Sequence, residues 1–288
     1  MPHPARRLDT LTLPDVDEPV TLDRISGDWH IHQLARGHRF STDDMLCAWL
    51  ALQHLPSPVR HLDLGTGIGS VATLVLWHRL GRPDQEHGRS RTTPDLEWPL
   101  LVGVEAQEVS HRLNRHTLRL NGLEDVVELR HCDLRSPLAL PDHEAGTYEL
   151  VTGSPPYIPL GKGVVSPHHQ RAACRMELRG DVFDYCEVAA RALHPNGIFC
   201  LVHAWGDPRP EAAMAKAGLT IRDRRDVYFR VNRDPTIVVW AAGMGGERSD
   251  GPDIVVRDPD GEMTDDYLTI RRTMGAPIYP SRKRSPAR

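Results

Sequence analysis

The residues of this sequence that could do chemistry are concentrated in Ser154-Pro155-Pro156-Tyr157. An apolar run at 148–151 predicts a short buried strand, and the Gly, Ser and paired prolines after it end that strand abruptly. Because the prolines lack N–H groups and have a fixed φ, the carbonyl groups of Ser154 and Pro155 become rigid acceptors beside the ring of Tyr157. This arrangement suits a flat substrate with an amino group, although a simple turn can have the same residues.

An exocyclic amine on a heterocycle is a poor nucleophile, because its lone pair is delocalised into the ring. Hydrogen bonds from both of its N–H groups to fixed acceptors favour release of that lone pair for attack on carbon. A neighbouring aromatic side chain can stack on the flat base. We therefore expect Ser154, Pro155, Pro156 and Tyr157 to be the catalytic residues.

A second pattern, Gly65-Thr66-Gly67-Ile68-Gly69, follows a predicted strand at 59–64 and precedes a predicted helix at 71–80. Glycines let the backbone turn tightly and approach a ligand closely, and the start of a helix offers free N–H groups. The spacing is Gly-x-Gly-x-Gly, which differs from the Gly-x-Gly-x-x-Gly of dinucleotide dehydrogenases. The segment therefore predicts a nucleotide-type cradle of another kind.

Acidic residues stand at the ends of three predicted strands: Asp63, Glu105 and Asp133. A carboxylate at the tip of the second strand, here Glu105, can accept hydrogen bonds from two ribose hydroxyl groups. Any one strand-end aspartate can instead be a helix cap or part of a turn. Three such acids at three strand ends indicate a ligand site at the carboxyl edge of a sheet.

Strands and helices alternate along most of the chain, which predicts a parallel sheet covered by helices. A helix capped by Ser41 or Thr42 comes before the glycines, and a helix at 182–193 follows the Ser154 turn. We expect late strands near 219–222, 227–231 and 236–240, of which two lie close enough to form an antiparallel hairpin edge. The fold class is therefore α/β.

The remaining segments read as additions to one main domain. We expect a poorly ordered N-terminal lead-in with room for one short strand, a polar surface insert, and a long polar loop at 161–177 that acts as a substrate-binding lid. The expected divisions are an N-terminal extension at 1–28, a main domain at 29–242 with the insert at 81–97, a C-terminal hairpin and helix at 243–276, and a disordered tail at 277–288.

Composition excludes several classes of protein. A formal net charge of −4 over 288 residues argues against a broad basic surface that coats nucleic acid, although arginines cluster locally at 222–233. The five cysteines form no C-x-x-C pair, which favours reduced thiols and a cytoplasmic location. We expect no membrane span, because no apolar run is long enough. We also expect no metal site, because the histidines at 30–38 lack a completing ligand.

With these residues in hand, the chain resembles class I S-adenosyl-L-methionine-dependent methyltransferases. Asp63-Leu64-Gly65-Thr66-Gly67-Ile68-Gly69 is similar to their glycine motif, Asp133-Leu134 to the pair that holds the cofactor adenine, and Ser154-Pro155-Pro156-Tyr157 to their amino-group motif. The resemblance implies a Rossmann-like, mostly parallel seven-stranded sheet with an antiparallel hairpin edge. It also implies the cofactor S-adenosyl-L-methionine, with S-adenosyl-L-homocysteine as the product.

Within that class the chain looks most like the bacterial tRNA(Val) N6-adenine methyltransferase family, from about Gln33 to Tyr267. The resemblance implies methyl transfer to N6 of adenine in RNA, with tRNA as the expected partner. The implied cofactor-binding residues are Gln33, Phe40, Thr42, Asp43, Asp63, Gly65, Thr66, Gly67, Gly69, Glu105, Ala106, Asp133, Leu134 and Ser154. The expected substrate-binding residues are Tyr157, Lys162, His168, Arg171 and Arg175.

One departure leaves the substrate open. The family usually has Asn where Ser154 stands, and Ser-Pro-Pro-aromatic is also familiar from cytosine N4 methyltransferases. A protein-glutamine methyltransferase offers a similar planar amide to such a site, but the chain before Asp63 is too short for the N-terminal domain of those enzymes. A SAM-binding subunit without its own chemistry and a dinucleotide oxidoreductase are the remaining alternatives.

Overall fold

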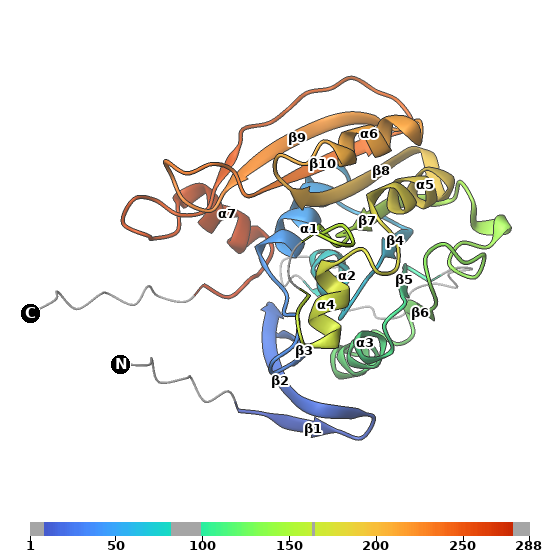
Figure 1. The fold of residues 1–288 in the computed structure, drawn as a ribbon, viewed down its shortest axis with the longest axis vertical. Coiled ribbons are helices and arrows are strands. Elements are labelled where there is room, and N and C mark those ends of the chain that lie inside the picture. Colours follow the sequence, from blue (N-terminus) through green and yellow to red (C-terminus); the bar gives the residue numbers. More distant parts are fainter. Residues whose placement is uncertain (1–8, 82–98, 163–164, 279–288) are drawn as a thin grey trace, which may run out of the picture.

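The chain is described by a computed structural model, which covers residues 9–81, 99–162 and 165–278 (Figure 1). Nearly all of the expected insert at 81–97 and most of the expected tail at 277–288 lie outside the described residues. None of the described helices is long and apolar enough to cross a membrane.

A mostly parallel sheet forms the centre of the molecule, with the strand order β11-β9-β10-β8-β7-β4-β5-β6. Strand β10 is antiparallel to both β8 and β9, so the predicted antiparallel hairpin edge is confirmed. Within the described residues the sheet has eight strands and not seven, because the short β11 pairs in parallel with the end of β9. The strands are β4 His61–Leu64, β5 Leu101–Glu105, β6 Val127–His131, β7 Tyr148–Gly153, β8 Leu193–Ala204, β9 Thr220–Tyr228, β10 Ile237–Gly243 and β11 Ile254–Val255.

Helices cover both faces of this sheet (Figure 1). Helices α1 and α2 pack into one apolar core, and α5 and α6 pack into a second core on the opposite face. The predicted cap of α1 is confirmed, because the Ser41 side chain accepts from the backbone of Asp43 and the Asp44 side chain accepts from the backbone of Ser41. The helices are α1 Thr42–His54, α2 Ser70–Leu76, α3 Glu108–Asn121, α4 His169–Arg175, α5 Val182–Ala192, α6 Arg209–Lys216 and α7 Asp265–Thr273, with a π-turn at Trp77–Gly81 and a 3₁₀ turn at Asp142–Glu144.

The expectation of a poorly ordered N-terminal lead-in is wrong for residues 11–28. Strands β1 (Leu11–Leu13), β2 (Val16–Ser26) and β3 (Trp29–Leu34) form an antiparallel sheet of their own. Acidic residues far outnumber basic ones in this segment, but Val20 and Ile25 are fully buried and join the core around α1. The boundary placed at residue 28 therefore separates two paired strands.

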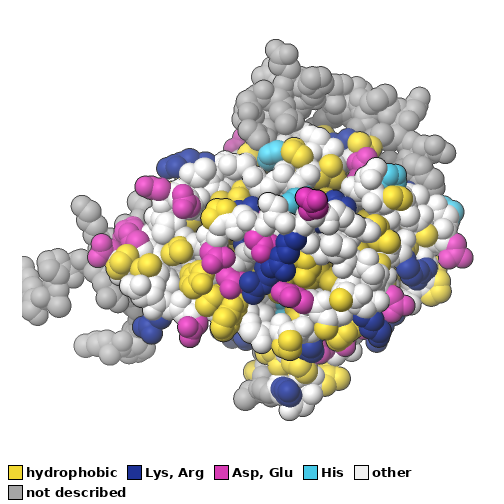
Figure 2. Space-filling model, turned by 90° about the horizontal axis from the view of Figure 1, so that it is seen from above, with side chains coloured by type: hydrophobic (Ala, Val, Ile, Leu, Met, Phe, Trp, Pro, Cys, Tyr) yellow, Lys and Arg dark blue, Asp and Glu magenta, His cyan; other side chains and the backbone are white. Residues whose placement is uncertain are grey.

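The region from 219 to 231 also differs from expectation, because β9 is one long strand and not two short ones. Its charged centre stays in the sheet because neighbouring side chains neutralise each other: Arg225 pairs with Asp223 at 2.8 Å and Arg224 with Asp226 at 2.8 Å. Two arginines of the cluster, Arg224 and Arg225, are therefore paired with acids. On the face drawn in Figure 2, Lys and Arg side chains are interspersed with Asp and Glu.

Helix α7 and the residues after it pack against the turn between β2 and β3 and against the start of α1. The backbone N–H of Gly27 donates to the carbonyl of Gly275 at 2.8 Å, and both glycines lie against the buried ring of Trp77. In α7 the Tyr267 hydroxyl lies 3.3 Å from the Thr42 hydroxyl at the start of α1. The packing of α7 therefore helps to fix the position where α1 begins.

We predict that Gly275→Ala lowers the free energy of unfolding by about 1–3 kcal/mol more than Gly218→Ala. Both glycines have positive φ, so both substitutions carry a similar backbone strain of about 1–2 kcal/mol. A Cβ at Gly275 would lie 2.2 Å from the Trp77 ring, whereas a Cβ at Gly218 meets nothing within 4 Å. Denaturant unfolding of the two variants measures the difference, and equal losses would contradict the packing of Trp77.

Candidate active site

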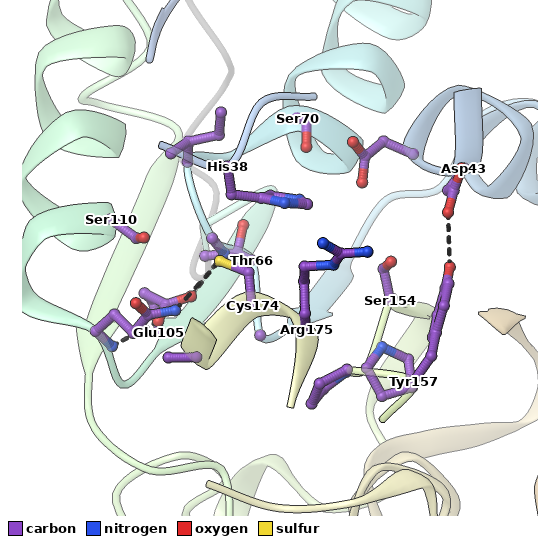
Figure 3. Close-up of a pocket in the computed structure, with 18 of the residues that line it drawn as sticks. His38, Asp43, Thr66, Ser70, Glu105, Ser110, Ser154, Tyr157, Cys174 and Arg175 are labelled. Atoms are coloured by element: carbon purple, nitrogen blue, oxygen red, sulfur yellow. Dashed lines mark hydrogen bonds between the residues drawn. The ribbon is translucent and has the colours of Figure 1, made fainter. Parts of the chain in front are cut away.

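A cavity of about 530 Å³ lies at the carboxyl ends of β4, β5 and β7 (Figure 3). Its walls come mainly from the glycine loop, the end of β5, the start of α1, the loop after β7 and helix α4. Of the residues predicted for catalysis and cofactor binding, the cavity is lined by Asp43, Gly65, Thr66, Gly67, Glu105, Ala106, Leu134, Ser154, Pro155, Pro156 and Tyr157.

The glycine loop passes three times through left-handed backbone, with φ of 62° at Gly65, 56° at Gly67 and 86° at Gly69. A Cβ at Gly65 would lie 2.0 Å from the hydroxyl of Tyr185, so this position requires glycine because of packing. A Cβ at Gly67 would meet only the carbonyl of Gly65, at 3.9 Å. The space in front of Gly67 is therefore open to a ligand, which can approach the backbone directly.

Glu105 is the buried carboxylate of the site, with 6 % of its surface exposed. It accepts hydrogen bonds from the backbone N–H groups of Gly67 at 2.8 Å and Gln107 at 2.5 Å. Burial nevertheless raises the pKa of Glu105 to about 7. Its two N–H partners leave lone pairs of both carboxylate oxygens available for a ligand that carries hydroxyl groups.

The start of α1 contributes two further acids, Asp43 and Asp44. Asp44 is buried, and burial together with the neighbouring Asp43 raises its pKa to about 7. Asp43 accepts a hydrogen bond from the Tyr157 hydroxyl at 2.9 Å, as Figure 3 shows. This end of the cavity is therefore acidic, and it favours a ligand with a positive charge.

The loop after β7 places Ser154 and Tyr157 on the wall of the same cavity. The Tyr157 ring lies against the ring of His203 with centroids 4.7 Å apart, and its hydroxyl is bound to Asp43. Burial and the Asp43 carboxylate raise the pKa of Tyr157 well above its usual value, so the phenol keeps its proton. Tyr157 is thus a fixed wall and not a mobile side chain.

Asp63 lies beneath the cavity and does not line it. The Thr152 hydroxyl donates to Asp63 at 2.6 Å and lies 2.6 Å from the Nε2 of His61. Burial raises the pKa of Asp63 to about 6 and lowers that of His61 to about 3. This buried network joins β4 to β7 directly below the glycine loop.

Five other residues that were predicted to bind the cofactor also lie outside the lining of the cavity. Gln33 is buried, and its amide oxygen accepts from the backbone N–H of Phe40 at 2.7 Å, so it shapes the loop before α1. The carboxylate of Asp133 pairs with Arg135 at 2.7 Å. The residues that do not line the cavity are Gln33, Phe40, Thr42, Gly69 and Asp133, in addition to Asp63.

Of the residues predicted to bind substrate, Tyr157 and Arg175 line the cavity. Arg171 donates to the carbonyl groups of Arg36 and Gly37, at 2.8 and 3.1 Å. His168 lies 2.9 Å from Glu18. Lys162 is exposed. The loop expected at 161–177 is not without structure, because it contains α4, which forms one side of the cavity.

Sequence reasoning missed several side chains of the cavity. Gln170 is buried in α4, accepts from the backbone N–H of His38 at 3.0 Å and donates to Ser110 at 3.2 Å. No local pattern marks these residues, since they meet only where α4 packs against α3 and against the loop before α1. The missed lining residues include His38, Asp44, Gln107, Ser110, Gln170, Cys174, Arg179, Tyr185 and Phe229.

We predict that Thr152→Val lowers the free energy of unfolding by about 1–3 kcal/mol, because it leaves the buried Asp63 and His61 without their shared partner. The matched control is Thr73→Val. Thr73 is equally buried, and its hydroxyl has no hydrogen-bond partner among the described residues, so its loss is neutral or slightly stabilising. Denaturant unfolding measures the free energy of unfolding of both variants. Equal changes in the two would show that the hydrogen bonds among Thr152, Asp63 and His61 do not stabilise the fold.

Comparisons with known proteins agree with this fold, although no family model matches the chain. The chain is 23% identical over 252 residues to a tRNA1(Val) (adenine(37)-N6)-methyltransferase of Aeromonas salmonicida (strain A449), covering 84% of this chain and 92% of the relative. Among solved structures it is similar to a predicted O-methyltransferase from Agrobacterium tumefaciens, with a TM-score of 0.54, 16% identity, and coverage of 82% of this chain and 98% of that one. The Rossmann-like fold expected of a class I methyltransferase is therefore confirmed, and most of the chain is similar in sequence to a tRNA N6-adenine methyltransferase.

Proposed function

We propose that the protein is an S-adenosyl-L-methionine-dependent methyltransferase that acts on N6 of an adenine in RNA, with tRNA as its substrate. The observation that carries the proposal is that one cavity contains both the Glu105 and glycine-loop cradle and the Ser154–Tyr157 acceptor loop. The name of the Aeromonas salmonicida relative supports the choice of adenine and tRNA.

The residues present fit this cofactor. Glu105 would accept hydrogen bonds from the two ribose hydroxyls of the cofactor. The open space in front of Gly67 would let the cofactor approach the backbone of the glycine loop. Leu134, with Val104 beside it, gives apolar contact for the adenine ring, and Asp43 and Asp44 complement the positive charge of the amino acid portion. When bound, the cofactor supplies a methyl group on a positively charged sulfur for in-line transfer.

The substrate half of the cavity lies around Ser154 and Tyr157. The Ser154 hydroxyl and the Pro155 carbonyl would accept the two N–H groups of the target amine, and the Tyr157 ring would form one wall of the base pocket. Phe229 also lines the cavity and is 36% exposed, so a base can reach it from outside. Such a pocket requires the target base to be unpaired or flipped out.

Positioning accounts for most of the catalysis in this proposal. Holding an amine and a methyl donor in line can lower the barrier by up to about 7–11 kcal/mol. Tyr157 stays protonated and bound to Asp43, so it does not act as a base. The proton released by the amine can pass to water, and the residues of the site need only orient the nitrogen.

Four cations beside the cavity would contact the RNA backbone. Arg171 and Arg175 lie in α4 and Arg179 lines the cavity, whereas Arg224 and Arg225 of β9 are paired with acids. With a net charge of −4, the protein offers phosphate only a local patch and not a broad basic face. The proposed phosphate contacts are Lys162, Arg171, Arg175 and Arg179.

The proposal is tested with methyl-labelled cofactor and three separate acceptors: unmodified tRNA, DNA and a protein extract. Nucleic acids are then digested to nucleosides. Label in N6-methyladenosine from tRNA supports the proposal. Label in N4-methylcytosine would mean that Ser154 marks a cytosine enzyme, and label in protein would move the substrate to glutamine. Cofactor binding without transfer to any acceptor would favour a non-catalytic subunit.

We predict that Tyr157→Phe lowers kcat/KM less than Tyr157→Ala does. The Phe variant keeps the ring and loses the hydrogen bond to the Asp43 carboxylate, which is worth about 1.5–3 kcal/mol. The Ala variant also loses stacking worth about 1–3 kcal/mol per base. Steady-state kinetics with the RNA substrate measures both, and equal rates for the two variants would exclude a stacking role for the ring.

We predict that affinity for the cofactor falls as pH falls below 7. The ionised form of Glu105 is the better acceptor for ribose hydroxyls, and its pKa lies at about 7, so protonation below that pH weakens binding by about tenfold between pH 8 and pH 6. Glu105→Gln should weaken binding by about 1.5–3 kcal/mol and reduce the pH dependence, leaving the part that comes from Asp44, whose pKa is also about 7. Calorimetric titration with S-adenosyl-L-homocysteine measures both effects.

The matched control for this titration is Glu108→Gln. Glu108 is an exposed carboxylate three positions along, paired with Arg112, so its loss changes the net charge but not the site. This variant should retain the wild-type affinity and pH profile. A pH-independent wild type, or an unchanged Glu105→Gln variant, would show that Glu105 does not hold the ribose.

A further inference from the structure

Three potential metal ligands meet outside the candidate active site: Glu18 in β2, and His168 and His169 at the start of α4. One ligand atom from each residue lies within 4.8 Å of the other two. The Nε2 of His168 lies 2.9 Å from a carboxylate oxygen of Glu18. Glu18 and His168 are 150 positions apart in sequence, so no spacing pattern could have shown this group.

The two imidazoles have an unusual relation for adjacent residues. Their rings are stacked, with centroids 5.3 Å apart and an angle of 19° between the ring planes. Successive residues at the start of a helix ordinarily point in different directions, whereas here both rings lie beside the same carboxylate. The Nδ1 of His168 is buried and makes no hydrogen bond within the described part of the chain.

We propose that Glu18, His168 and His169 form a binding site for a divalent transition metal ion, with Zn²⁺ as the best match. Imidazole and carboxylate are its common ligands, at about 2.0–2.2 Å from the metal. His169 is exposed and can rotate to close the remaining distance. Three protein ligands leave one tetrahedral position for water. The proposal departs from the expectation, drawn from the sequence, that the protein has no metal site.

The consequence of such a site is structural. Helix α4 has seven residues and no side-chain cap, and helices of this length are not stable by themselves. A metal bound by Glu18 and the two histidines would fasten the start of α4 to the N-terminal sheet. Because Gln170 and Arg175 of α4 line the active-site cavity, metal binding would order one of its walls.

The test is calorimetric titration of the full chain, dialysed against chelator, with Zn²⁺ alone. We expect one equivalent to bind to the wild type and at least tenfold weaker binding to His169→Ala and to Glu18→Gln. His169 is exposed, so its loss should leave the fold intact, which circular dichroism verifies. The control His194→Ala removes an exposed histidine elsewhere and should bind as the wild type does.

Co²⁺ provides a second readout that does not depend on activity. Binding at the proposed site gives visible absorption bands without a thiolate charge-transfer band, and His169→Ala removes the visible bands. A thiolate band would place the metal on a cysteine such as Cys174 and overturn the proposal. Equal Zn²⁺ affinity in wild type and His169→Ala, or no binding to the wild type, would overturn it as well. None of these outcomes depends on the proposed methyl transfer.

Discussion

The pairing of β4 with β7 is the constraint on which the site depends. In this register Asp63 lies opposite Thr152 and Leu64 opposite Gly153, so the chain leaves the two strands at equivalent positions, Gly65 and Ser154. The glycine loop and the acceptor loop therefore start side by side. The buried hydrogen bond between Thr152 and Asp63 specifies this register, because a shift by one residue would bury both groups without partners.

Electrostatics then divides the cavity into parts with different preferences. Glu105 and Asp44 are buried acids whose pKa values are both raised to about 7. Asp43 lines the same cavity, and its carboxylate accepts a hydrogen bond from the Tyr157 hydroxyl. A cationic ligand lowers the cost of keeping such carboxylates ionised. The acceptor loop adds further oxygen atoms and no strong base. The cavity is accordingly suited to holding a positively charged donor next to a neutral amine.

Most of the central sheet could be predicted from the sequence, because its strands are short apolar runs ended by Gly, Pro or an acid. The positions of Glu105 and Ser154 on the cavity could be predicted for the same reason, because each residue stands at the end of such a strand. Asp133 shares the signal but pairs with Arg135, which shows that a strand-end acid does not by itself specify where its carboxylate points. The continuity of β9 could not be predicted, since it depends on Asp223 and Arg225 neutralising each other along one face of the strand.

The features that could not be predicted from the sequence depend on contacts between segments that are distant in the chain. Some of these contacts link the C-terminal helix α7 to the candidate active site. Trp77 holds Gly275, α7 places Tyr267 beside Thr42, and the first turn of α1 then presents Asp43 to Tyr157. The acceptor loop is therefore supported by packing at the far end of the chain. A loosening of α7 would shift the start of α1 and release Tyr157, even though no residue of α7 lines the cavity. A small misplacement of the reacting atoms can lower a reaction rate by a large factor. Such a shift would therefore lower the rate of methyl transfer more than it lowers the free energy of unfolding.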